Sequence, residues 1–203
     1  MNKIQIEEKS IYPSKVVCIG RNYVEHIVEL DNEIPEQMVF FIKPNSAISD
    51  VIISNVEEPI HYEAEISFVI TDNKISAVGV GLDMTKRGIQ SALKNKGLPW
   101  ERAKAFDNSA VFSPFIPFTG DVTSLSMRLF INDLETQHAN YPLMINKPEE
   151  IIDEVGTFMR FEDGDILMTG TPKGVGVAHK GDRFKGQVFY NDKLLLEQHW
   201  TVL

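Results

Sequence analysis

Two glutamates, Glu63 and Glu65, stand two positions apart in the stretch from His61 to Ile70, where polar and apolar side chains alternate. Because successive side chains of a β-strand point to opposite faces, this spacing places both carboxylates on one face. Like charges this close repel each other unless a cation lies between them. Asp83 ends the next predicted strand, which a turn brings back alongside, so it can add a third oxygen. The spacing predicts a site for a hard divalent cation, with positions left open for water or substrate.

The residue types favour Mg²⁺ or Mn²⁺ over zinc, because no thiolate and no evident group of histidines accompanies the carboxylates. The alternative is that Glu63 and Glu65 simply line a solvated face of a sheet. His61 either extends the site or is an ordinary half-buried histidine, and we favour the second interpretation.

A possible acid/base pair lies nearer the N-terminus, where His26 and Glu29 are three positions apart. If this segment is helical, the two side chains share a face, and the carboxylate can orient the imidazole and raise its basicity. Such a pair can activate water. The alternative is an exposed surface pair on a polar turn.

Several positively charged residues could anchor an anion. Arg21 directly follows Gly20 at the end of a predicted strand and either holds a substrate carboxylate or caps a loop. Lys43 and Lys104 lie beside apolar residues rather than in a charge run, so each is either an anion anchor or a snorkelling surface lysine. The segment 169–176, which contains Thr171, is rich in glycine and hydroxyl groups and forms either an anion-binding nest or a tight turn without a ligand.

The elements that must position these groups are mostly β-strands. Helices are expected from Tyr23 to Leu30, from Thr85 as N-cap to a stop at Gly97, and from Pro148 onward. Asp72 and Asn73 are expected to form a hairpin turn. The pattern predicts strands over 15–19, 39–42, 61–70, 74–82, 129–131, 166–168, 187–190 and 194–197. No composition shift marks a linker, so we expect one domain over residues 1–203.

The bulk composition excludes several classes of protein. The net charge of −9 argues against a nucleic-acid binder that neutralises phosphates, and any anionic substrate needs local positive charge. The single cysteine, Cys18, excludes an intrachain disulfide framework and is expected in the core. No signal peptide or membrane span is recognisable, so we expect a cytoplasmic protein.

Five ordered motifs together resemble the fumarylacetoacetate hydrolase family, in its branch of acylpyruvases and oxaloacetate decarboxylases. They are Gly20-Arg21-Asn22-Tyr23 with His26 and Glu29, Phe41-Ile42-Lys43-Pro44, His61-Tyr62-Glu63-Ala64-Glu65, Leu82-Asp83-Met84-Thr85, and the glycine-rich segment 170–176. The likeness covers nearly the whole chain. One departure is Gly88, where the family often carries an aspartate.

The resemblance implies an α+β fold, mostly β, of twisted mixed sheets with a few short helices, and a homodimer. It implies that Glu63, Glu65 and Asp83 hold Mg²⁺ or Mn²⁺ and that the helix with His26 and Glu29 closes as a lid. It further assigns a catalytic role to Lys104 and substrate contacts to a group of four residues: Arg21, Lys43, Gln90 and Thr171.

The function implied is cleavage of a small 2-oxo acid through a metal-bound enolate. We expect first a C–C bond hydrolase acting on acylpyruvates or fumarylpyruvate, because the His26 and Glu29 pair is present. The alternatives are an oxaloacetate decarboxylase and a keto–enol tautomerase or isomerase of 2-oxo diacids, which share the same intermediate. A non-catalytic protein that binds keto acids is a further alternative.

Overall fold

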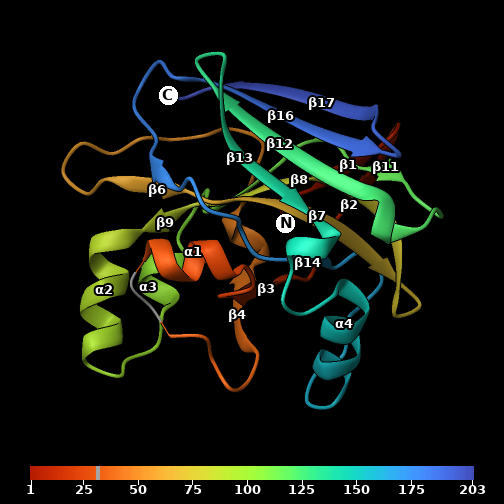
Figure 1. Cartoon of the computed structure of the whole chain (residues 1–203), viewed down its shortest axis with the longest axis horizontal. Helices are drawn as coiled ribbons and strands as arrows, with labels where there is room; N and C mark the ends of the chain where they lie inside the picture. The colour runs from red at the N-terminus through yellow and green to blue at the C-terminus, as the bar shows by residue number, and fades with distance from the viewer. Residues whose placement is uncertain (31–32) are drawn as a thin grey trace.

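The computed structural model of the chain describes residues 1–30 and 33–203, which are mostly β-structure with short helices at the edges (Figure 1). The sheet at the centre mixes parallel and antiparallel pairs, since β14 runs parallel to β3 and antiparallel to β7. Its strands, in spatial order, are β4 (Val39–Pro44), β3 (Lys15–Gly20), β14 (Ile166–Met168), β7 (Ala64–Thr71), β8 (Lys74–Asp83), β10 (Ala110–Phe112) and β5 (Ile48–Ser49), with β11 (Ile116–Pro117) added on β8.

A second, four-stranded sheet lies over the central one and appears at the top of Figure 1. Its spatial order is β13 (Leu134–Asn140), β12 (Leu125–Ile131), β16 (Arg183–Tyr190) and β17 (Lys193–Thr201). Two small sheets complete the β-structure: β15 (Gly176–Val177), β6 (Ile60–Tyr62) and β9 (Thr85–Lys86) form one, and β1 (Ile4–Ile6) and β2 (Lys9–Ile11) form the other.

The helices stand around the sheets, with α1, α2 and α3 gathered at one end and α4 apart from them (Figure 1). Their bounds are α1 (Val24–Glu29), α2 (Arg87–Asn95), α3 (Glu101–Lys104) and α4 (Pro148–Gly156), with 3₁₀ turns η1 (Asn45–Ala47), η2 (Val122–Ser124) and η3 (Tyr141–Leu143). No helix in the described part of the chain is long and apolar enough to cross a membrane. The cytoplasmic location stays a prediction.

Short hairpin turns set the register of the sheets. Asp72 and Asn73 have φ angles of 51° and 54° and connect β7 directly to β8, with Thr71 opposite Lys74. Two consecutive residues with positive φ match the right-handed twist of the strands they join, which explains the preference for Asn and Asp there. The predicted hairpin is confirmed.

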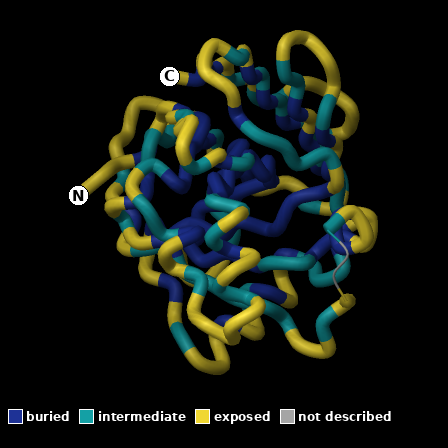
Figure 2. Tube along the Cα trace, turned by 90° about the vertical axis from the view of Figure 1, so that its left-hand side faces the viewer, coloured by how far each residue is buried: buried dark blue, intermediate teal, exposed yellow. Residues whose placement is uncertain are grey.

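Strand β7 is buried on both of its faces, as its seven residues from Ala64 to Ile70 show. On one face Ile66 and Phe68 belong to the larger apolar core, which also contains side chains of the four-stranded sheet. On the other face Val69 packs in a smaller core that includes Cys18, so the predicted core position of this cysteine is confirmed. Figure 2 shows the buried segments in the middle of the molecule and the exposed loops around them.

The three predicted helices are present, but some of their predicted first and last residues were wrong. Helix α2 begins at Arg87 and not at Thr85, because Thr85 belongs to β9 and pairs with His61. Gly97 follows α2 with a φ of 63°, a left-handed conformation that glycine adopts without strain, and this confirms the predicted stop. We also expected helix α4 to carry an apolar stripe formed by Ile151, Ile152, Val155 and Phe158. Helix α4 ends at Gly156, so Phe158 lies outside the helix and is exposed, and its place in the stripe was wrong.

Candidate active site

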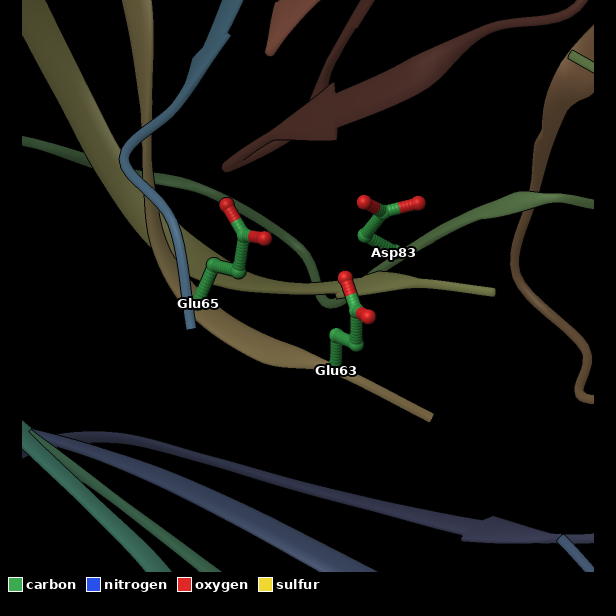
Figure 3. A group of neighbouring side chains, drawn as sticks. All are labelled: Glu63, Glu65 and Asp83. Carbon is green, nitrogen blue, oxygen red and sulfur yellow. The ribbon is translucent and has the colours of Figure 1, made fainter. Parts of the chain in front are cut away.

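Three carboxylates project into the same space, as Figure 3 shows. Glu63 lies at the junction of β6 and β7, Glu65 on β7, and Asp83 at the end of β8. Their relative exposures are only 5%, 2% and 1%, which rules out the solvated sheet face considered above. Each offers one oxygen, and these oxygens all lie within 4.8 Å of one another. The cluster can therefore hold a metal ion.

The donor set fits a hard cation. All three ligand atoms are carboxylate oxygens, the donors that Mg²⁺ and Mn²⁺ prefer. Asp83 Oδ1 is fully buried and accepts no well-directed hydrogen bond among the described residues, although an ammonium group lies close to it. The backbone N–H of Asp83 donates to the carbonyl of Glu63 at 2.8 Å, and this bond fixes the two residues relative to each other.

Lys104, at the end of α3, places its ammonium group between these carboxylates. Its Nζ donates to Glu63 Oε2 at 2.7 Å, to Asp83 Oδ2 at 2.5 Å and to Thr85 Oγ1 at 2.6 Å. Burial alone would lower the pKa of Lys104, but the charges of Asp83 and Glu63 outweigh it and raise the pKa above its ordinary value. The side chain therefore stays cationic at neutral pH.

Two of the carboxylates have opposite electrostatic environments. Burial would raise the pKa of Glu63, but Lys104 and Arg87 outweigh it and hold the pKa well below its ordinary value. Burial, together with the charges of Asp83 and Glu63, raises the pKa of Glu65 well above its ordinary value, although the N–H of Gly170 donates to Glu65 Oε2 at 2.6 Å. The cationic side chains therefore act more strongly on Glu63 than on Glu65.

The predicted acid/base pair is formed at the rim. His26 Nδ1 lies 3.1 Å from Glu29 Oε2, so the carboxylate can fix the orientation of the ring. The other oxygen of Glu29, Oε1, accepts a hydrogen bond of 2.9 Å from the N–H of Gly174 in the glycine-rich segment. Helix α1, which the resemblance predicts to be a lid, is also joined to that segment by an ion pair of 3.2 Å between Glu25 and Lys173.

The carboxylates, Lys104 and His26 all line one pocket. The remaining predicted residues that line it are Arg21, Gln90 and Thr171. The Thr171 hydroxyl donates to the carbonyl of Ala64 at 2.9 Å and accepts from Gln137 at 2.8 Å, so its position is fixed from two sides.

Arg21 has a φ of 59°, a left-handed conformation that is unusual for a residue other than glycine. Such backbone strain is often retained where a side chain must be aimed at a site.

Lys43 is placed differently from the other predicted residues. Its side chain is fully buried, and its Nζ lies 2.8 Å from Asp83 Oδ1, behind the carboxylate rather than along the pocket wall. Gly88 lies at the start of α2, and nothing lies within 4 Å of the position that a Cβ would occupy there. Asp83 is instead supported by Lys43 and Lys104.

Two further cations of the pocket were missed by the sequence analysis. Arg87 pairs with Glu63 and donates to Gln90 Oε1 at 2.7 Å, and Lys94 lines the pocket one turn beyond Gln90 on α2. The signal was present, because Arg87, Gln90 and Lys94 recur at helical spacing on one face. Among the described residues that line this pocket, four are cationic: Arg21, Arg87, Lys94 and Lys104.

A buried carboxylate cluster, a lysine and an oriented imidazole around one pocket are the features of an enzyme active site. The chain belongs to the fumarylacetoacetate hydrolase family, because the model of the fumarylacetoacetate (FAA) hydrolase C-terminal domain matches residues 15–197. The resemblance inferred from the sequence motifs is thereby confirmed, as is the mostly β fold of mixed sheets.

The relatives carry the names of several reactions. The chain is 39% identical to oxaloacetate tautomerase YcgM of Escherichia coli, over 84% of this chain and 87% of the relative. It is 35% identical to a mitochondrial oxaloacetate decarboxylase of Dictyostelium discoideum, over 84% of this chain and 87% of the relative.

A solved structure of fumarylpyruvate hydrolase from Pseudomonas aeruginosa, in complex with Mn²⁺ and pyruvate, superimposes with a TM-score of 0.88 at 27% identity and covers 99% of this chain and 95% of that one.

Proposed function

We propose that this protein is a metal-dependent enzyme that interconverts the keto and enol forms of a 2-oxo dicarboxylic acid, with oxaloacetate as the first compound to test. The names of the relatives support this alternative over the hydrolysis expected first, which is not confirmed. The observation that carries the proposal is that an oriented imidazole, His26, shares one pocket with the ammonium of Lys104. Enolisation requires a base for a carbon-bound proton and positive charge for the oxygen that becomes negative.

We further propose that Glu63, Glu65 and Asp83 hold Mg²⁺ or Mn²⁺. When bound there, the cation would supply Lewis acidity that lowers the energy of an enolate. The residues of the chain do the rest. His26, with its ring held by Glu29, removes a proton from C3 of the 2-oxo acid, and the proton is returned to the 2-oxo oxygen, so that only a proton moves. Lys104 stays cationic and stabilises the negative charge that develops on this oxygen.

The charge of the pocket supports a dicarboxylate. Among the described residues, four cationic side chains line the pocket, in a chain whose overall charge is −9. A substrate with two carboxylates can interact with more of these cationic side chains than a substrate with one. Arg21 and Lys94 lie outside the carboxylate cluster in this pocket and can receive the second carboxylate.

A second candidate is hydrolysis of an acylpyruvate or fumarylpyruvate, which the His26 and Glu29 pair favours because it can also activate water. The similar solved structure is of a fumarylpyruvate hydrolase.

The test uses metal-stripped protein with and without restored Mg²⁺. The decay of enol oxaloacetate, read by its ultraviolet absorbance, is compared with pyruvate release from oxaloacetate and from fumarylpyruvate. We expect Mg²⁺-dependent enol decay, lost by at least about 100-fold in His26→Ala and unchanged in His138→Ala, a matched substitution of an exposed histidine. Decarboxylation driven by the metal alone would persist in His26→Ala. Pyruvate release from fumarylpyruvate faster than enol decay would instead establish the hydrolase.

A further inference from the structure

Lys43 is a buried charge that the proposed reaction does not use. It lies on β4 with no exposed surface and is the bulkiest of the fully buried side chains. Burying an ammonium group is costly unless it is paired and hydrogen-bonded, so its partners show what it is for.

The partners of Lys43 belong to one segment of chain. Its Nζ donates to the carbonyl of Ser109 at 2.8 Å, to that of Met84 at 3.4 Å and to that of Lys104, and it pairs with Asp83 Oδ1 at 2.8 Å. The segment from 84 to 109 leaves the sheet after Asp83, forms α2 and α3, and returns to β10. The ammonium group of Lys43 therefore holds together the two ends of the segment from 84 to 109.

The curl of the central sheet makes this possible. Strand β4 is at one edge of the sheet and β10 lies near the other, yet η1 leads directly from β4 to β5, which pairs with β10. Lys43 spans the remaining gap from β4 to the carbonyl of Ser109, next to β10.

Asp83 is held by two lysines from opposite sides. Lys43 faces Oδ1 from the core, and Lys104 faces Oδ2 from the pocket. A carboxylate with an ammonium group on each oxygen cannot rotate without separating a buried ion pair. Lys43 also fixes the backbone of Lys104 through the carbonyl of that residue.

We infer that Lys43 is a positioning residue, which orients the Asp83 carboxylate and the backbone of Lys104 and does not contact the substrate. This differs from the substrate-binding role predicted from the sequence. The kinetic part of its test rests on the proposed function, whereas the metal-binding part does not.

The test is a double-mutant cycle with Lys43→Gln and Lys104→Met, read by the affinity for Mn²⁺ and by kcat and KM of enol oxaloacetate decay. Both lysines act on Asp83. We therefore expect the change in Mn²⁺ affinity of the double variant to differ by about fivefold or more from the product of the changes in the two single variants. We expect Lys43→Gln to lower kcat at least about tenfold with KM nearly unchanged, and to lower it no further in the Lys104→Met background. The exposed Lys96→Gln is the matched control and should show no coupling.

Two outcomes overturn the inference. Effects on Mn²⁺ affinity that multiply within about twofold would mean that Lys43 acts independently of the site, as a packing residue does. A rise in KM with kcat unchanged would mean that it binds substrate. If the protein binds Mn²⁺ with the expected coupling but turns over no 2-oxo acid, the proposed function fails and the inference stands.

A structure of the wild-type protein with Mn²⁺ and oxalate tests the same point without a substitution, in case Lys43→Gln does not fold. Lys43 Nζ should remain on Asp83, and a contact between Lys43 and oxalate would overturn the inference.

Discussion

Glu29 uses its two oxygens for two partners: Oε2 faces His26, and Oε1 accepts from the N–H of Gly174. One side chain thus orients the imidazole of His26 and joins helix α1 to the segment that carries Thr171. The two tasks can be separated, because glutamine keeps an oxygen acceptor without the charge and alanine removes both.

We predict that Glu29→Gln lowers kcat of enol oxaloacetate decay by about 100-fold, because the imidazole loses its charged partner. The thermal midpoint should stay within a few degrees of wild type. Glu29→Ala should lower kcat as much and also increase amide hydrogen exchange at Gly174. Equal exchange in both variants would show that the link to Gly174 does not hold helix α1 in place.

A substitution of Lys94 tests whether this residue binds the second carboxylate of the substrate. Burial and the positive charges of Arg21 and Arg87 lower the pKa of Lys94, so its ammonium group lies in a cationic environment that an additional anion would favour. We predict that Lys94→Met raises KM about tenfold for oxaloacetate, since a charged hydrogen bond is lost. KM for a 2-oxo acid lacking the second carboxylate should not change, and Lys96→Met is the control. A similar rise for both substrates would remove Lys94 from the second carboxylate.

The carboxylates could be predicted from the sequence because alternation and a two-residue turn are local rules. Glu63 and Glu65 share a face because side chains of a strand alternate every two residues, and the hairpin between β7 and β8 brings Asp83 beside them. Lys43 and Lys104 could not be told apart in this way, since both are lysines among apolar residues. Only the curl of the sheet places one behind Asp83 and the other in front of it.

At the scale of elements, one buried carboxylate joins the start of β3 to the start of β14. Asp165 accepts hydrogen bonds from the N–H of Ser14 at 2.9 Å and of Glu162 at 2.9 Å, and it pairs with Lys15. Burial alone would raise the pKa of Asp165, but the bonds from Lys15 and Glu162 outweigh it and lower the pKa below the ordinary 3.8.

We predict that Asp165→Asn lowers the free energy of unfolding at pH 7 by about 3 kcal/mol, because it removes one partner of a buried pair. A carboxyl whose pKa is lower in the folded state stabilises above its unfolded pKa, and this contribution is lost as pH falls through the folded value. The difference between wild type and Asp165→Asn should therefore shrink below about pH 4 in urea titrations. A difference that stays constant from pH 7 to pH 3 would contradict this account.

The elements themselves were predictable to unequal degrees. Helix α4 and the hairpin at Asp72 and Asn73 follow from Pro148 and from turn chemistry, which act over a few residues. The predicted start of α2 was wrong. Thr85 is a residue type that often caps a helix, but its hydroxyl accepts a hydrogen bond from Lys104, nineteen positions away, and such a distant contact cannot be read from the local sequence. Helix α3 is too short to show a helical period.

At the scale of the whole molecule, an apolar group is left on the surface near the C-terminus. Val56 is 94% exposed, and the backbone of this segment is bonded to Leu203, which is also exposed, through the N–H of Ser54. Exposed apolar residues can contribute to an interface when they are part of a larger patch, so this segment is the position that we test.

We predict a homodimer, with a mass in solution of twice the 23.0 kDa chain by light scattering. Val56→Asp should weaken it, because the charge would be buried without a partner. Leu134→Asp, at an exposed hairpin on the other sheet, is the control. A dimer that withstands Val56→Asp would place the interface elsewhere, and a monomeric wild type would refute the homodimer.

The pairing of β3 with β14 has a consequence for biosynthesis. Lys15 and Asp165 meet although they are 150 positions apart, whereas β7 and β8 meet across two residues. The ribosome therefore releases the hairpin that bears all three acidic side chains long before the strand that lies between β3 and β7. Until that strand emerges, β3 and β7 each have an unpaired edge, which is prone to aggregation. We expect nascent chains stalled before residue 166 to be bound by chaperones, and chains that include β14 to be released from them.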